Sequence, residues 1–189
     1  MNNAKKFLMC FKQKMSNCGL AMYKKGGINF TEYVTLAVRE IIEKEFGIHS
    51  EKEYFRIDII GWKDRKEEIV NQANQIKMNP HLWDLCIAVE HENSICDWSD
   101  ELIKLVHIRC PLKVIIGYNH CDCREKNELD KLTAASSWMK KTSAFDPTIK
   151  ETYLIILGNG SPLFSKDYYT SFDYRGYVYD YKTGGFVQL

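Results

Sequence analysis

Residues 83–93, WDLCIAVEHEN, form the stretch of sequence on which our interpretation of the fold depends. The five apolar residues Leu85–Val89 are typical of a strand that is buried on both faces. The run ends abruptly in Glu90, His91 and Glu92. Because side chains alternate along a strand, Glu90 and Glu92 are expected on one face and His91 on the other. Two carboxylates at the end of a core strand are costly to bury unless a cation or a proton neutralises them, so the pattern predicts a metal site.

The composition is that of an ordinary globular protein with one substantial core. The chain has 189 residues, of which 45% are hydrophobic and 27% charged. No apolar run approaches the roughly 20 residues that span a bilayer, and the first residues lack the apolar segment of a secretory signal. Seven cysteines, scattered and odd in number, fit a reducing compartment. We therefore expect a cytoplasmic protein without membrane contact.

Helical and strand-like patterns alternate along the chain and predict a single α/β or α+β domain. The predicted helices cover 7–22, 31–46, 63–75, 97–108 and 125–141, and the predicted strands cover 54–62, 85–89, 112–118 and 153–157. A tyrosine-rich hairpin is expected over 174–185. We divide the chain into a basic N-terminal helix or arm (1–27), a core (28–160) and a C-terminal hairpin region (161–189).

Asp58 is the second acidic residue in an unusual position, because it stands between isoleucines in the predicted strand 54–62. Consecutive strands are usually neighbours in a sheet, so Asp58 is expected to face Glu90. Oxygen ligands of this kind suit Mg²⁺, or Mn²⁺, with water and substrate phosphate completing the coordination. The alternative is that Asp58 forms an ion pair with Arg56 or Lys113.

A family resemblance rests on these acids and on the order of the predicted elements. A helix, strands that carry Asp58 and then Glu90-His91-Glu92, a further helix and a further strand resemble the restriction-endonuclease-like superfamily, the PD-(D/E)XK phosphodiesterases. The resemblance covers roughly residues 30–120 and implies a central mixed β-sheet flanked by helices. It implies that Asp58 and Glu90 bind the metal ion, and that a helical acid, Glu40 or Glu43, completes the acidic cluster.

The sequence departs from the family pattern at two positions. No proline precedes Asp58, and Glu92 occupies the position of the motif lysine, which orients or activates the attacking water. A glutamate cannot supply positive charge, so Glu92 would act as a base for water or as a further metal ligand. Lys104 and Lys113 are the residues that could reach the site in place of the missing lysine.

The resemblance implies a Mg²⁺-dependent phosphodiesterase that acts on DNA in the manner of an endonuclease. Many enzymes that cut duplexes work as dimers, so a homodimer is a candidate state. The first alternative is a catalytically inactive nuclease-like module that binds nucleic acid or a protein partner, and the glutamate at position 92 favours it. A second alternative is a hydrolase for a small phosphorylated molecule. No organic cofactor is expected, because Gly158-Asn159-Gly160 is too short for a dinucleotide loop.

Positive charge is concentrated near the N-terminus. Residues 1–31 contain six lysines and no acid, a charge of +6, so the rest of the chain, whose total is +1, carries −5. Lys24 and Lys25 are therefore candidate contacts to nucleic-acid phosphates. The alternative is that these lysines line the solvated side of a helix.

A second group of potential metal ligands surrounds the predicted strand 112–118. His107 and Cys110 precede it, and His120, Cys121 and Cys123 follow it. These residue types bind Zn²⁺, but the spacing matches no standard zinc finger and the two groups lie at opposite ends of a strand. We interpret the cysteines as reduced thiols.

Overall fold

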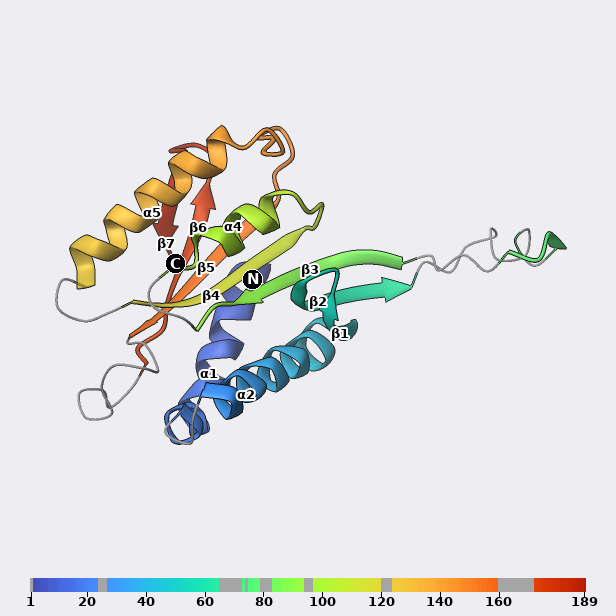
Figure 1. Ribbon diagram of the computed structural model, residues 1–189, viewed down its shortest axis with the longest axis horizontal. Helices are drawn as coiled ribbons and strands as arrows, with labels where there is room; N and C mark the ends of the chain where they lie inside the picture. The colour runs from blue at the N-terminus through green and yellow to red at the C-terminus, as the bar shows by residue number, and fades with distance from the viewer. Residues whose placement is uncertain are drawn as a thin grey trace.

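Seven strands form one mixed sheet in the part of the chain that the structure, a computed structural model, describes (Figure 1). The described residues are 2–23, 27–64, 73, 75–78, 83–93, 97–119, 124–159 and 172–189. The strands lie side by side in the order in which they occur in the sequence. They are β1 (His49–Tyr54), β2 (Ile57–Asp64), β3 (Trp83–His91), β4 (Leu112–Asn119), β5 (Thr152–Asn159), β6 (Arg175–Asp180) and β7 (Gly185–Gln188).

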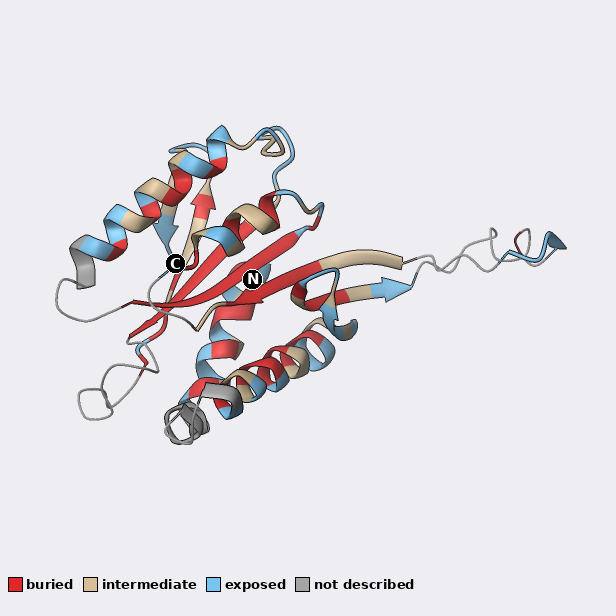
Figure 2. Cartoon of the chain, viewed as in Figure 1, coloured by how far each residue is buried: buried red, intermediate tan, exposed pale blue. Residues whose placement is uncertain are grey.

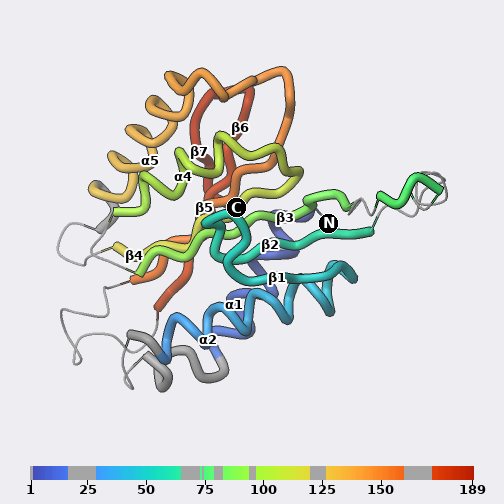
Figure 3. Tube along the Cα trace, turned by 45° about the vertical axis from the view of Figure 1, so that its right-hand side comes forward, coloured from blue at the N-terminus to red at the C-terminus, as the bar shows by residue number. Residues whose placement is uncertain are grey.

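The sheet is antiparallel at both edges and parallel in its centre. The strands β1, β2 and β3 pair antiparallel, β3, β4 and β5 pair parallel, and β5, β6 and β7 pair antiparallel again. The two parallel steps are made through α4 (Ser99–Val106) and α5 (Arg124–Lys141). Since parallel crossovers are right-handed and both advance in the same direction, the two helices lie on the same face of the sheet (Figures 1 and 3).

The other face is covered by α1 (Asn3–Tyr23), α2 (Gly27–Glu40) and the π-helical turn η1 (Ile41–Glu45). The predicted apolar stripe of the second helix is confirmed, since Val34, Val38 and Ile41 are buried in the core on this side. A second core lies between the sheet and α4 and α5. The central strands are buried between the two helical layers, which accounts for their continuous apolar sequences (Figure 2).

The predicted strand over 54–62 is confirmed from Ile57 onward, but it begins three residues later than expected. The strand β1 ends at Tyr54 and β2 begins at Ile57, and the two pair across a two-residue turn of Phe55 and Arg56. Both turn residues have positive φ, 48° and 63°. The sequence of β1, HSEKEY, is polar because β1 is an exposed edge strand, so it lacks the apolar alternation that identifies a strand.

The terminal regions also differ in detail from the expectation. The N-terminal segment contains a packed helix, α1, which buries Phe7 and Phe11 in the core. The C-terminal hairpin is confirmed as β6 and β7, with Gly184 in the left-handed conformation that its turn requires. The predicted helix over 63–75 lies largely outside the described residues. No helix among the described residues has both the length and the apolar character needed to cross a membrane.

Candidate active site

The pairing of β2 with β3 brings Asp58 and Glu90 together. Ile59 is paired with Val89, so the register sets Asp58 opposite Glu90. Both side chains project from the face that α4 covers, as Ile60 and Ala88 do. In addition to burial, the charge of Asp58 raises the pKa of Glu90, as expected for two neighbouring carboxyl groups.

Asp58 is half-buried and is oriented by the backbone of the neighbouring strand. Its Oδ2 accepts a hydrogen bond of 2.8 Å from the backbone N–H of His91. Burial raises the pKa of Asp58 above its usual value, and the hydrogen bond from His91 opposes this shift. The hydrogen bond therefore fixes the position of the carboxyl group, although burial still disfavours its ionised form.

Glu90 is the most deeply buried acid of the site, with 1% of its surface exposed. Burial raises the pKa of Glu90 to about 8, the hydrogen bond from Lys104 lowers it, and the charge of Asp58 raises it further. Its Oε1 has no donor among the described protein groups. One oxygen of the site is thus buried without a compensating partner unless a proton or a cation is present.

Lys104 brings a positive charge to this pair from α4. Its Nζ lies 3.0 Å from Oε2 of Glu90 and 2.6 Å from Oε2 of Glu101, and it donates a hydrogen bond of 3.2 Å to the carbonyl of Arg56. Burial alone would lower the pKa of Lys104, but hydrogen bonds to Glu101 and Glu90 outweigh it and raise the pKa. The ammonium therefore stays charged. The sequence indicated Lys104 only as one of two alternatives and did not indicate Glu101, although the i, i+3 spacing on a helix connects them.

Glu40 is not part of this cluster, and its assignment to the acidic site needs correction. It lies on α2, which packs against the opposite face of the sheet. It forms ion pairs with Lys14, at 2.5 Å, and with Lys44. Hydrogen bonds from these two lysines lower the pKa of Glu40 to about 2. Glu43, the alternative helical acid, lies 3.7 Å from Arg39 on the same side.

The remaining sequence-predicted residues have separate positions. Glu92 follows the last residue of β3, and its backbone N–H donates to the carbonyl of Ile116 at 2.9 Å. Lys113 is buried against Glu151, with Nζ 2.5 Å from Oε2, so it is not the partner of Asp58. His91 projects from the other face, where its Nε2 lies 3.1 Å from the hydroxyl of Tyr118.

Two predictions fall partly or wholly outside the described residues. Lys24 and Lys25 are not described, and neither are His120, Cys121 and Cys123. Of the possible zinc ligands, Cys110 is buried, and burial raises the pKa of its thiol to about 12. His107 is exposed. The thiol of Cys110 is buried and protonated, and the imidazole of His107 is exposed. These two residues therefore do not form part of a zinc site.

The carboxyl pair fits a hard cation better than it fits an all-protein metal cage. Among the described residues, no group of three or more His, Cys, Asp or Glu side chains could hold a metal ion. Mg²⁺ is commonly bound through one or two carboxylates, with water and phosphate as its other ligands. Asp58 and the uncompensated Oε1 of Glu90 provide a donor set of this kind.

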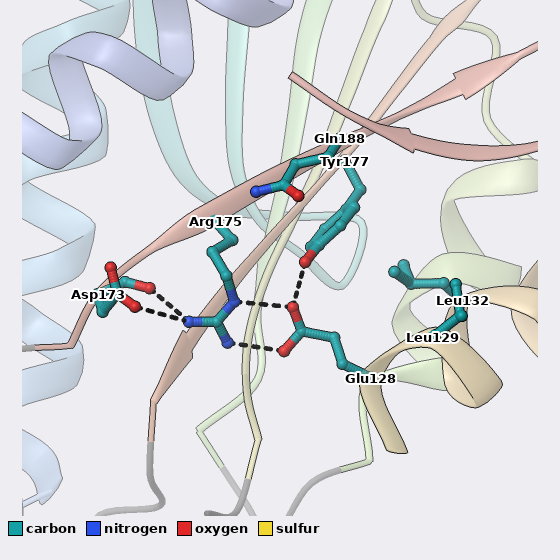
Figure 4. A pocket seen from close by; sticks show the side chains of 7 residues that line it. All are labelled: Glu128, Leu129, Leu132, Asp173, Arg175, Tyr177 and Gln188. Atoms are coloured by element: carbon teal, nitrogen blue, oxygen red, sulfur yellow. Dashed lines mark hydrogen bonds and ion pairs between the residues drawn. The ribbon is translucent and has the colours of Figure 1, made fainter. Parts of the chain in front are cut away.

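A second polar cluster lies at the carboxyl ends of β4 and β5, beside a pocket of about 370 Å³ (Figure 4). At its centre Arg175 donates to both carboxylate oxygens of Glu128, with Nε and Nη2 at 2.8 and 2.7 Å. Tyr177 also donates to Glu128, and Asn119 donates at 2.9 Å. Each oxygen of Glu128 is therefore satisfied, and the cluster ties β6 to α5 and β4. We interpret it as structural.

No protein-family model, no characterised protein and no solved structure matches this chain.

Proposed function

We propose that this protein is a Mg²⁺-dependent phosphodiesterase that cleaves DNA, with Asp58 and Glu90 as its metal ligands. The observation that carries the proposal is the pairing of half-buried Asp58 with buried Glu90, one oxygen of which has no donor among the described residues. Neighbouring acids removed from water in this way destabilise a fold unless their charge is compensated. A bound divalent cation would compensate the negative charge of both acids and would take part in catalysis.

The order of elements supports the same proposal. The series α2, β1, β2, β3, α4, β4 matches the helix, three strands, helix and strand that the PD-(D/E)XK resemblance implies. Asp58 lies on the second strand of this series and Glu90 near the end of the third. The lysine of the family motif is replaced in sequence by Glu92, and Lys104 supplies an ammonium at the carboxylate itself.

Each residue of the site has a role that follows from its contacts. The N–H of His91 holds Asp58, so that its second oxygen can face a ligand. When bound, Mg²⁺ polarises the phosphodiester and lowers the pKa of a bound water molecule. Lys104 remains protonated and can stabilise the negative charge that develops on the phosphate oxygens. It therefore acts through its charge, and Glu92 is the candidate base for the attacking water.

Cleavage of labelled DNA by the full chain tests this proposal. Activity is expected with Mg²⁺ or Mn²⁺ and is expected to stop when EDTA is added. Asp58→Asn and Glu90→Gln should each reduce the rate roughly 100-fold or more. The matched control is Asp130→Asn, because Asp130 is an exposed acid on α5, away from β2 and β3. A Glu90→Gln variant that cleaves as fast as the unchanged protein would contradict the site assignment.

The alternative function, a non-catalytic module that binds nucleic acid or a protein, is favoured by one contact. Lys104 already neutralises one oxygen of Glu90, so an internal ion pair could replace the metal ion. Thermal unfolding with Mn²⁺ separates the two functions, because a ligand at 100 times its Kd stabilises the folded state by about 2.7 kcal/mol. The enzyme should gain stability and its Glu90→Gln variant should not. An inert module would show neither a shift nor cleavage.

A further inference from the structure

A row of aromatic side chains extends from the candidate active site along the β1–β2–β3 edge of the sheet. We call Phe55, Tyr54, Trp83 and Trp62 the aromatic row. The ring centroids of successive members are 4.6, 5.2 and 6.2 Å apart, and the contacts with Tyr54 are edge-to-face. His49 continues the row, with its ring 4.5 Å from that of Trp62.

The row lies on the same face of the sheet as the two acids. Tyr54, Trp62 and Trp83 pack at the margin of the core that α4 covers, and all three remain partly exposed. An irregularity in the pairing of β2 with β3, between Gly61 and Trp62, lets this face continue past the buried part of the sheet. Bulges of this kind redirect side chains and are frequent next to active sites.

The turn that joins β1 to β2 places an apolar side chain and a cation at the end of the row. Phe55 is 82% exposed. Both turn residues have positive φ, which is unfavourable for a bulky side chain and is usually left to Asn or Gly. The guanidinium of Arg56 is exposed and makes no hydrogen bond or ion pair with any described residue. Strained conformations of this type concentrate at functional sites.

The turn is connected directly to the candidate active site. The carbonyl of Arg56 accepts a hydrogen bond from Lys104, the same ammonium that contacts Glu90. Asp58 follows Arg56 by two residues in the sequence. A strand held at the site by a phosphate can therefore reach Arg56 and the aromatic row without leaving this face.

We propose that the aromatic row is a stacking platform for unpaired bases of the DNA strand that is cleaved, and that Arg56 binds a neighbouring phosphate. This inference rests on the proposed nuclease function and specifies its substrate. Aromatic side chains bind single strands by stacking on the faces of the bases, and paired bases in a duplex keep those faces covered. The preferred substrate thus contains a single-stranded segment next to the scissile bond.

Intrinsic fluorescence tests the platform without any cleavage. The chain has four tryptophans, of which Trp62 and Trp83 belong to the row, Trp98 is buried and Trp138 lies 49% exposed on α5. Short oligothymidine, added to the Glu90→Gln variant in EDTA, is expected to quench the fluorescence and to bind about tenfold more tightly than duplex DNA. Trp138→Phe is the control and should keep the quenching. Trp83→Leu should lose most of it.

Substitutions at exposed residues provide a second test in case a tryptophan variant fails to fold. Phe55→Ala and Arg56→Ala should each weaken oligothymidine binding by about tenfold, with an unchanged circular dichroism spectrum. Lys150→Ala, an exposed cation far along the chain, is the control for Arg56. If oligothymidine causes no quenching, or if Phe55→Ala binds it as well as the unchanged protein does, the platform is refuted. Because binding is measured without metal, failure of the nuclease proposal appears separately, as DNA that is bound but never cut.

Discussion

The ammonium of Lys104 lies 3.0 Å from Oε2 of Glu90, although the two residues belong to different layers of the fold. Glu90 comes from the central strand β3, and Lys104 from the helix that connects β3 to β4. The crossover that covers the carboxyl pair therefore also supplies its counter-charge. Lys104 follows Glu90 by 14 positions in the sequence, and in the proposed nuclease it would supply the positive charge that Glu92 cannot.

Removing the ammonium should impair catalysis more than it impairs folding. Lys104→Met is expected to reduce the Mg²⁺-dependent cleavage rate roughly 100-fold, because the developing phosphate charge loses the cation beside Glu90. Lys104→Arg should keep part of the activity. The measurement is the single-turnover rate on labelled DNA. Lys140→Met, which removes an exposed lysine that donates a hydrogen bond to the carbonyl of Gly184, is the control. Equal rates for the two methionine variants would exclude this role of Lys104.

The buried acid Glu90 should destabilise the metal-free protein as the pH rises. Its folded-state pKa is about 8, above the usual 4.5, so the folded state binds more protons between these values. The free energy of unfolding should therefore fall as the pH rises through this window, by at most about 1.4 kcal/mol per pH unit for one proton. Glu90→Gln should flatten the profile measured by urea unfolding in EDTA. A steeper profile for the variant would contradict the assignment of this pKa.

The ion pair between Arg175 and Glu128 should have the opposite effect on the pH dependence: the free energy of unfolding should fall as the pH becomes acidic. Burial would raise the pKa of Glu128, but hydrogen bonds from Arg175, Tyr177 and Asn119 outweigh it, and the pKa lies below its usual value. The stabilisation is therefore complete above the unfolded pKa and is lost as the pH falls through the folded one. Arg175→Met should cost about 3–5 kcal/mol at pH 7, since it leaves a buried carboxylate unpaired.

A double substitution provides the control for this pair. Arg175→Met with Glu128→Gln should recover part of the loss measured by urea unfolding at pH 7, because the buried charge is removed along with its partner. An additive effect of the two substitutions would mean that the ion pair contributes nothing to the fold.

The contact between α1 and β6 should tolerate no side chain at Gly176. A Cβ at this position would clash with Cδ2 of Leu8, a buried residue of α1. Gly176→Ala should therefore lower the stability by about 1–3 kcal/mol, the usual cost of overpacking. Gly185→Ala in the next strand is the matched control, because a Cβ there would meet nothing within 4 Å. Equal melting temperatures for the two variants would refute this packing argument.

The central sheet was predictable because its strands are buried on both faces. The apolar runs of β3, β4 and β5 identify them without ambiguity, and the strands end within two residues of the predicted positions at their carboxyl ends. Edge strands carry no such signal. In β1 the residues are polar and exposed, so β1 was not predicted as a strand of its own.

The site was only partly predictable, for a related reason. The pairing of Asp58 with Glu90 follows from the rule that consecutive strands are neighbours, and the alternation of side chains places them on one face. Which face each helix covers cannot be read from amphipathic spacing. Glu40 was therefore grouped with the acids although α2 lies on the opposite side, and Lys104 could not be selected over Lys113.

The sequential order of the strands in the sheet has a consequence for how the protein is made. Each strand pairs with the strand that precedes it in the sequence, so the sheet can grow from β1 towards β7 while the chain leaves the ribosome. Glu128 lies on α5 and precedes Arg175 by 47 positions in the sequence, so it is synthesised first. Its buried charge is neutralised only when β6 docks, which makes the arrival of the last hairpin the step that completes the native state.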